Sequence, residues 1–213
     1  MYNLLSKYLI IMFITFEGID LSGKSTQAKL LYDYLKEKKK KVIIVREPGG
    51  TEISEKIRDI LLDKKNINMK YLTEFLLFSA SRYQLTEEII KPHLKHGYYV
   101  ICDRYYDSST AYQGYGGKID ISIINSVNKI ATGNLIPDLS FLIDISYKEN
   151  LNRREKMKKS HDRIEQKEIS YYTKVIDGYR TIAQKDKKRF KVLDGTKPIP
   201  DLQKEIIKLI LKK

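Results

Sequence analysis

The chain of 213 residues is 42% hydrophobic, so it can bury one good core, and its length predicts one domain over 1–213. A formal charge of +13 is compatible with a nucleic-acid partner or an anionic small substrate, but much of it lies in runs such as 36–41 and 156–159, which usually solvate helix ends. The single cysteine, Cys102, excludes a disulfide framework and a cysteine-based metal cluster, and it favours a reducing, cytoplasmic location.

An apolar stretch opens the chain. Residues 4–14 lack the basic start and the small-residue cleavage site of a signal peptide, and Lys7 interrupts them. We therefore expect 1–11 to be an extension that leads into the first strand, with no membrane segment. Met12 is an alternative translation start.

The segment from Phe13 to Gln27 has the pattern of a phosphate-binding loop. An apolar strand leads into G-x-x-x-x-G-K-[ST] at Gly18, Gly23, Lys24 and Ser25, and a helix opens at Ser25. Glycines allow backbone N–H groups to turn around a polyphosphate, the lysine reaches its β and γ oxygens, and the serine hydroxyl can ligate Mg²⁺. An ordinary Gly/Ser turn is the alternative, which the strand before and the amphipathic helix after disfavour.

Strands and helices then alternate. The first helix ends in the basic run 36–41, and 42–45 forms the second strand. The loop 46–51 lies at the carboxyl end of that strand, where open α/β sheets bind ligands. A helix with apolar residues at 53, 57, 60 and 61 carries Arg58 on another face. A longer helix runs from about 70 to 90, and Pro92 ends it.

Two residues of the longer helix, Phe78 and Arg82, stand one turn apart beside an apolar stripe. From the pattern alone, the simpler interpretation places the phenylalanine at the edge of the core and the arginine in solvent.

The third strand, 98–102, is followed by Asp103 and Arg104. An acid at the carboxyl end of a buried strand beside a phosphate loop is a natural Mg²⁺ partner, and the adjacent arginine can clamp a phosphate. A surface salt bridge is the less favoured alternative. Glycines 114, 116 and 117 are expected to loosen the chain before a helix at about 119–131.

The last third predicts two more strands, 139–144 and 190–193, around a basic segment at about 151–165 and a helix that contains Ile164 to Ile182. The basic segment is either a solvated helix or, in a phosphoryl-transfer protein, a mobile lid over the donor phosphates. Five strands separated by helical segments predict a parallel sheet covered on both faces.

The chain resembles bacterial-type thymidylate kinases over nearly its whole length from Phe13. The resemblance rests on six motifs in order: 16–26, 46–51, 77–82, 103–109, 111–114 and Asp162-Arg-Ile-Glu165. The first motif alone indicates only a nucleotide. The resemblance as a whole implies a P-loop NTPase-type three-layer α/β sandwich, with a parallel five-stranded sheet, helices on both faces and a lid. It also implies that the protein transfers the γ-phosphoryl group of ATP to dTMP.

The resemblance also implies site residues. ATP would contact Gly18, Ile19, Asp20, Leu21, Ser22, Gly23, Lys24, Ser25 and Thr26, and Mg²⁺ would be held by Ser25 and Asp103, directly or through water. The dTMP site would comprise Asp20, Pro48, Arg58, Phe78, Arg82, Arg104, Ser108, Tyr112 and Gln113. Phe78 would stack on thymine, Arg82 would bind its carbonyl edge, and Tyr112 would crowd the 2′ carbon. The catalytic residues would be Asp20, Lys24, Arg104 and the lid cations Lys156 and Lys158, which are lysines where the family usually has arginines.

Three other functions compete with this reading. A kinase for another nucleoside monophosphate is the nearest rival. A regulatory GTPase needs N-K-x-D, and Asn128-Lys129 is followed by Ile130 and Ala131. A nucleic-acid-binding module would use the positive charge, but no aromatic-basic RNA signature is present, so we expect no nucleic-acid partner. The family resemblance suggests a homodimer.

Overall fold

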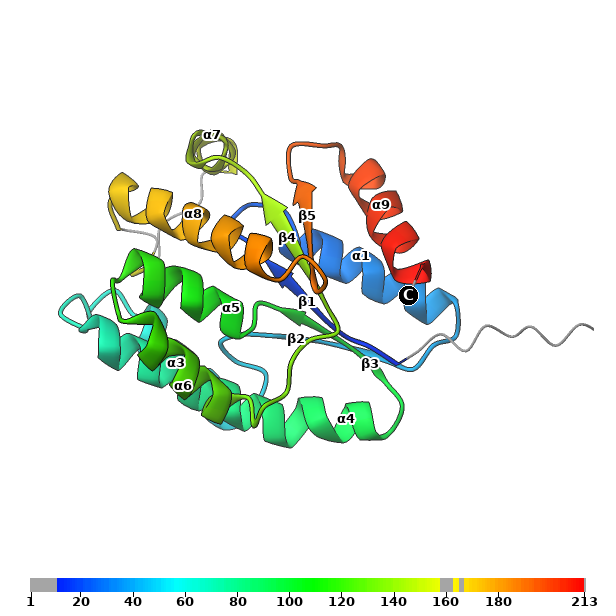
Figure 1. Ribbon diagram of the computed structural model, residues 1–213, viewed down its shortest axis with the longest axis horizontal. Helices are drawn as coiled ribbons and strands as arrows, with labels where there is room; N and C mark the ends of the chain where they lie inside the picture. The colour runs from blue at the N-terminus through cyan, green and yellow to red at the C-terminus, as the bar shows by residue number, and fades with distance from the viewer. Residues whose placement is uncertain (1–10, 158–162, 165–166, 213) are drawn as a thin grey trace, which may run out of the picture.

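The computed structural model describes residues 11–157, 163–164 and 167–212. Five parallel strands form one sheet in the order β2-β3-β1-β4-β5 (Figure 1). They are β1 Phe13–Glu17, β2 Val42–Arg46, β3 Tyr99–Asp103, β4 Leu139–Asp144 and β5 Phe190–Asp194. The predicted five-stranded parallel sheet is confirmed. Because β1 is central and all strands point the same way, the loops that follow β1, β2 and β3 meet at one edge.

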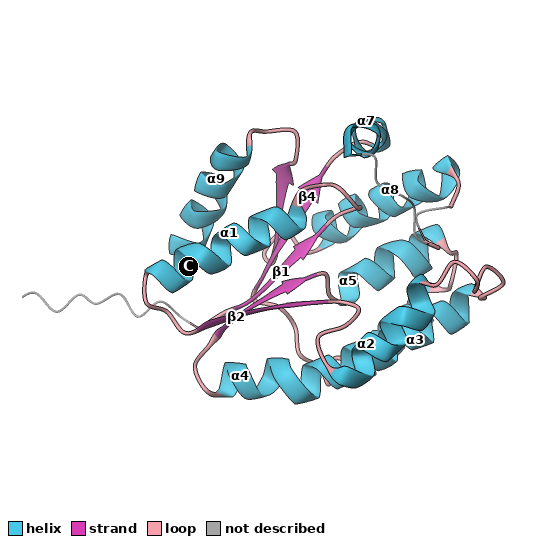
Figure 2. Cartoon of the chain, turned by 180° about the vertical axis from the view of Figure 1, so that it is seen from behind, coloured by secondary structure: helices cyan, strands magenta, loops and turns pink. Residues whose placement is uncertain are grey.

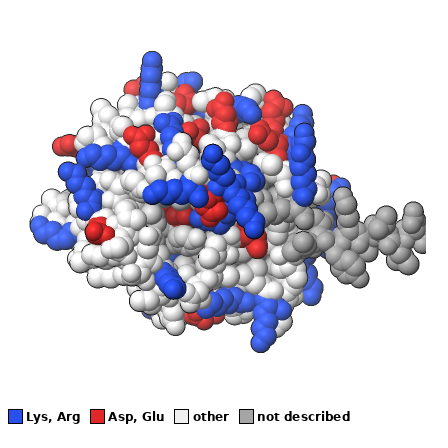
Figure 3. Space-filling model, viewed as in Figure 1, with Lys and Arg blue, Asp and Glu red and all other residues white. Residues whose placement is uncertain are grey.

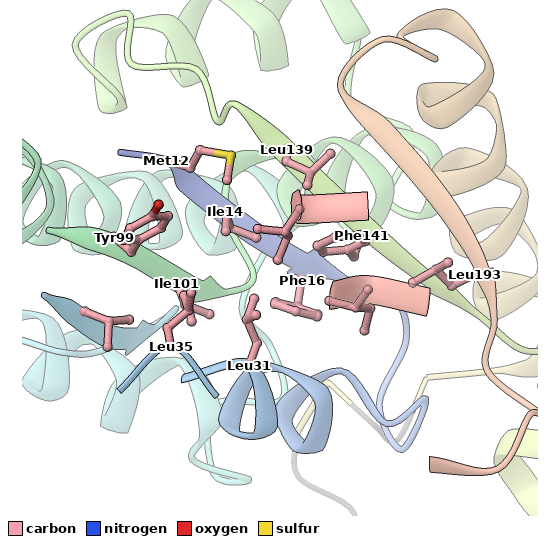
Figure 4. Packing of buried hydrophobic residues seen from close by; sticks show 14 of the residues in the cluster. Met12, Ile14, Phe16, Leu31, Leu35, Tyr99, Ile101, Leu139, Phe141 and Leu193 are labelled. Carbon is pink, nitrogen blue, oxygen red and sulfur yellow. The ribbon is translucent and has the colours of Figure 1, made fainter. Parts of the chain in front are cut away.

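One face of the sheet packs on α1 (Lys24–Glu37) and α9 (Ile199–Leu211). Alternate residues of the central strand, Ile14 and Phe16, meet Leu31 and Leu35 of α1 in this core (Figure 4). Phe13 points to the opposite face, as strand alternation requires. This packing fixes α1 directly behind the loop that joins it to β1.

Helices cover the opposite face as well, so the sheet is the middle of three layers (Figure 2). The remaining helices are α2 Glu52–Leu62, α3 Tyr71–Leu85, α4 Lys91–Lys95, α5 Tyr106–Ser109, α6 Ile121–Ala131, α7 Tyr147–Met157 and α8 Ile169–Lys185. Where α8 meets the sheet, Tyr112, Tyr171, Tyr172 and Tyr179 form a cluster of rings with neighbouring centroids 5.7–6.5 Å apart. In the described part of the chain, no helix is both long and apolar enough to span a membrane.

The prediction that Pro92 ends the long helix is wrong. A π-helical segment, η1 (Thr86–Ile90), follows α3, and the N–H of Lys91 donates to the carbonyl of Thr86. Pro92 then falls in the first turn of α4 and the chain stays helical to Lys95. Because α4 continues directly from η1, the N–H that Pro92 lacks falls where the helix passes from π-helical to α-helical hydrogen bonding.

The glycines at 114 and 116 do not loosen the chain, because both lie in a second π-helical segment, η2 (Thr110–Gly116). A Cβ on Gly116 would lie 2.7 Å from the Tyr171 ring of α8, and a Cβ on Gly114 would lie 2.8 Å from Ile121 of α6, so each glycine allows one helix to pack closely against η2. The helix expected to contain Ile164 begins only at Ile169.

Candidate active site

A pocket opens at the carboxyl ends of β1, β2 and β3, and it gathers most of the predicted site residues. Its walls include Asp20, Lys24, Ser25, Pro48, Arg58, Phe78, Arg82, Asp103, Arg104, Ser108, Tyr112 and Gln113. All the predicted dTMP-contacting residues therefore share one cavity with three of the predicted ATP-contacting residues, Asp20, Lys24 and Ser25. Arg46, Glu47, Leu62, Ser109 and Ile164 also line it, and the sequence motifs assigned no role to them.

The phosphate loop adopts a backbone that needs glycine. Gly18 has φ +135°, and a Cβ there would lie 2.6 Å from the carbonyl oxygen of Ile143. Gly23, which precedes α1, has φ +102° and provides no side-chain cap. The first N–H groups of α1 are thus open to an anion, where the helix dipole also favours negative charge. Leu21 also adopts a left-handed conformation, with φ +58°.

Lys24 lies on the inside of this loop. Its side chain is 8% exposed, and Nζ lies 3.4 Å from the carbonyl oxygen of Ile19 and 3.7 Å from Asp20 Oδ1. Burial, with a further contribution from nearby Arg104, lowers the pKa of this lysine. Binding an anionic phosphate would counter both effects, since it would add a negative charge beside the ammonium group.

Ser25 and Asp103 form the candidate magnesium site. The Ser25 hydroxyl donates to Asp103 Oδ2, and Asp103 Oδ1 is buried without a hydrogen-bond partner among the described residues. No cluster of three or more histidine, cysteine or acidic residues suited to a metal occurs in the described ranges. Mg²⁺ in nucleotide sites usually takes only one or two protein ligands, with water and phosphate completing the shell. The orphaned carboxylate oxygen fits that requirement.

Arg104 links the phosphate loop to the far wall of the pocket. It adopts φ +72°, and its guanidinium donates to the carbonyl of Gly18 at 2.7 Å and to Asp20 Oδ1 at 2.8 Å. It also donates to Ser108 Oγ at 3.2 Å and lies over the Tyr112 ring. The less favoured alternative, a surface salt bridge, does not apply, because Arg104 pairs with Asp20 inside the pocket and its side chain is 14% exposed.

Glu17, to which the motifs assign no role, binds Ser108, which in turn accepts a hydrogen bond from Arg104. Its carboxylate accepts from the backbone N–H of Tyr105 at 2.8 Å and from Ser108 Oγ at 2.6 Å. Burial, reinforced by Asp107, raises the pKa of Glu17 to about 8. The available signal was the strand pattern, because a glutamate in an otherwise apolar buried strand requires a partner.

The base side of the pocket contains Phe78 and Arg82. Arg82 is only 1% exposed, so the interpretation that placed it in solvent is wrong. It donates to Glu47 at 2.8 Å, Asn128 at 3.1 Å and Ser109 at 3.0 Å. A guanidinium has five N–H donors, so these three contacts leave two for a ligand.

Arginines also line the loop between β2 and α2. Arg58 donates to the carbonyl of Pro48 at 2.9 Å, and Arg46 donates to the same oxygen at 2.8 Å. Both side chains reach the pocket wall. Arg46 belongs to the motif at 46–51, but the motif assigned no role to it.

The basic segment contributes a different cation from those predicted. In α7, Arg153 donates to the carbonyls of Leu21 and Ser22 at 3.0 and 3.1 Å, so it contacts the phosphate loop directly. Lys156 is exposed in the last turn of this helix. Lys158, Asp162 and Glu165 lie outside the described residues, as does the extension before residue 11, so the predictions for them stay predictions.

Comparisons with known proteins agree with one another on the family. A family model described as thymidylate kinase matches residues 16–206. The chain is 48% identical over 195 residues to the thymidylate kinase of Sulfurihydrogenibium sp. (strain YO3AOP1), covering 92% of this chain and 94% of the relative. It is 48% identical over 201 residues to that of Thermosipho africanus (strain TCF52B), covering 94% and 98%.

A solved structure shares the fold. The crystal structure of thymidylate kinase from Ehrlichia chaffeensis matches with a TM-score of 0.77 and 38% identity, covering 94% of this chain and 98% of that one. Sequence and structural similarity thus extend over almost the full length of both partners. The chain belongs to the thymidylate kinase family.

Proposed function

We propose that this protein transfers the γ-phosphoryl group of ATP to dTMP, giving ADP and dTDP. The observation that carries the proposal is the single pocket that holds both the phosphate-loop lysine, Lys24, and the aromatic–guanidinium pair, Phe78 and Arg82. A donor triphosphate in the loop and a pyrimidine against Phe78 would have their phosphates face each other near Arg104.

The acceptor in this reaction is already a phosphate oxyanion, so no strong general base is needed. The difficulty is to bring two polyanions together in line, and catalysis consists of positioning and charge stabilisation. Lys24 would bind the transferred phosphoryl group from the donor side, and Arg104 and Arg58 would hold the acceptor phosphate. Mg²⁺ would be held by Ser25 and Asp103 and would neutralise phosphate charge.

The sugar and base would be selected by the opposite wall. Tyr112 is held in place by Asp20, 3.4 Å from its hydroxyl, and by the Arg104 guanidinium over its ring. A fixed ring in this place would crowd a 2′-hydroxyl, which favours deoxyribose. Asp20 would lie near the 3′-hydroxyl and also orients Arg104.

We also propose that the basic segment at about 151–165 acts as a lid. Arg153 already connects α7 to the phosphate loop, and Ile164 lines the pocket. Closure would bring cations over the donor phosphates and exclude water, which would otherwise accept the phosphoryl group. Arg153 is the lid cation that the contacts favour, beside the sequence-based candidates Lys156 and Lys158.

The proposal is tested by measuring ADP release with dTMP, dUMP, dCMP, dGMP and AMP as acceptors. We expect dTMP to have the highest kcat/KM, and we expect Lys24→Ala and Arg104→Ala each to lower turnover roughly a hundredfold or more. A folded Lys24→Ala protein with near-normal turnover would refute the assignment. A preference for AMP would favour the rival monophosphate kinase.

A homodimer is part of the proposal. Large apolar side chains are exposed on α2, α3 and α6: Ile53, Ile60, Leu72, Leu76, Tyr83, Ile123 and Ile130. Figure 3 shows that the surface over α3 and α6 is mostly uncharged, whereas basic and acidic side chains mix elsewhere on this face. A second copy would bury these side chains. Light scattering should give twice the chain mass, and Leu76→Glu should give the monomer.

A cytoplasmic location is also part of the proposal, in line with the free thiol of Cys102.

A further inference from the structure

Glu74 is a buried carboxylate that contacts Gln113 in the pocket wall. The proposed reaction assigns no role to Glu74. It lies in the first turn of α3, and its side chain is 1% exposed. Three cationic or polar groups converge on it. Gln113 Nε2 donates at 2.8 Å, Arg163 approaches at 2.7 Å, and Lys167 lies 3.2 Å away.

The contact with Gln113 determines which way its amide faces. An ionised carboxylate only accepts hydrogen bonds, so the NH₂ group of Gln113 must turn towards Glu74. Gln113 is 2% exposed and lines the pocket, and with its NH₂ group held at Glu74 its carbonyl oxygen Oε1 is the acceptor that it can offer to a ligand. If residue 74 could donate, the amide would be free to rotate by half a turn and present NH₂ instead.

We propose that Glu74 is a positioning residue that holds Gln113 as a hydrogen-bond acceptor for the pyrimidine ring and joins this contact to Arg163, at the end of the proposed lid, and to Lys167 just after it. The inference rests on the proposed placement of dTMP in this pocket.

The chemistry of the bases gives this orientation a consequence for specificity. Thymine carries a donor at N3–H and an acceptor at O4, whereas cytosine carries an acceptor at N3 and a donor at its 4-amino group. A carbonyl oxygen on Gln113 matches the thymine donor and opposes the cytosine acceptor. The free N–H groups of Arg82 match O4 for the same reason. Together, the two side chains would discriminate against cytosine twice.

The cationic partners connect the same carboxylate to the end of the lid. Arg163 is buried, and its Nε donates to the carbonyl of Leu61 at 2.7 Å, at the end of α2. The ammonium group of Lys167 lies 4.4 Å from the ring centroids of both Tyr71 and Tyr171. Between them, Arg163 and Lys167 contact both oxygens of Glu74 and leave it little freedom to move away.

The test compares kcat/KM for dTMP and dCMP in the wild-type protein, Glu74→Gln, Gln113→Ala and the double variant. We expect Gln113→Ala to lower the dTMP to dCMP ratio roughly tenfold, the size of one lost hydrogen bond. Glu74→Gln should lower it to a similar extent, and the double variant should be no less selective than Gln113→Ala alone. A purely structural role would lower both kcat/KM values by one factor.

The inference is overturned if Glu74→Gln leaves the ratio unchanged, or if its effect multiplies with that of Gln113→Ala. An unchanged ratio in Gln113→Ala overturns it as well, while dTMP phosphorylation by the wild-type protein would still stand. Because Glu74→Gln removes a buried negative charge, Glu74→Asp provides a second variant. It keeps the charge opposite Arg163 and Lys167 but withdraws the carboxylate by about 1.5 Å, one C–C bond, and it should also lower the ratio.

Discussion

Replacing Arg82 with methionine should destabilise the protein strongly, because it removes the hydrogen-bond partner of a buried carboxylate. Glu47 is 5% exposed; its Oε2 accepts from Arg82, and its Oε1 has no partner in the described part of the chain. Breaking one side of a buried ion pair costs about 3–5 kcal/mol. For a chain of this size each kcal/mol lowers the unfolding midpoint by about 2–4 °C, so we expect a decrease of roughly 6–20 °C.

Thermal unfolding followed by circular dichroism measures this effect. Burial raises the pKa of Glu47 and Arg82 lowers it, so without the arginine the pKa in the folded state rises further above its unfolded value. The folded variant then binds a proton more tightly, and its deficit should be larger at about pH 8 than at about pH 5.5.

The double variant Arg82→Met with Glu47→Gln is the matched control. Because it leaves no buried charge, it should recover at least half of the lost stability. If the double variant is as unstable as Arg82→Met, or if the single variant unfolds within about 2 °C of the wild type, the buried pair does not carry the stability that we assign to it.

Three further predictions concern the phosphate loop and the residues that contact it or precede it. Gly18→Ala should abolish ATP binding or destabilise the fold by about 1–3 kcal/mol, because its Cβ would meet the Ile143 carbonyl at 2.6 Å. Glu17→Gln should gain stability relative to the wild type as the pH rises from about 6 to 9, because the raised pKa of about 8 makes ionisation of the buried carboxyl costly in the folded state. Arg153→Ala should raise KM for ATP several-fold, because two contacts to the loop carbonyls are lost.

Each of these outcomes has its own check. Gly23→Ala shares the positive φ of Gly18 but has open space around the new Cβ, so calorimetry should find it the milder change. A stability difference between Glu17→Gln and wild type that stays constant from about pH 6 to pH 9 would contradict the raised pKa of Glu17. Arg153→Ala should leave KM for dTMP unchanged, and an equal rise in both KM values would point to general loosening of α7.

The strands and the phosphate loop could be predicted because local patterns determine them. The apolar run from Phe13 and the glycines at 18 and 23 carry their own conformational requirements. Pro92 was misjudged because the π-helical turn before it depends on packing of α3 and α4 against the sheet. The role of Gly116 in η2 escapes prediction for a related reason, since its small size accommodates α8, which is distant in sequence.

The site could be predicted to the level of residue names but not of contacts. Arg82 is a case in point, because its burial depends on Glu47, Ser109 and Asn128, which lie on three other segments. Arg153 could not be distinguished from its basic neighbours by composition, since only the docking of α7 brings it to the phosphate loop. Long-range pairing of charged side chains is the information that one sequence does not display.

The tyrosine cluster beside the pocket provides the protein with a built-in optical reporter. The chain contains 16 tyrosines and no tryptophan, so its near-ultraviolet emission comes from phenol rings alone. Tyr112 lines the pocket and lies 6.1 Å, between ring centroids, from Tyr179, close enough for excitation to pass between the rings. Nucleotide binding against this wall should therefore change intrinsic fluorescence without a label. A single tryptophan introduced on α9 would add emission at longer wavelength from the opposite layer of the sandwich.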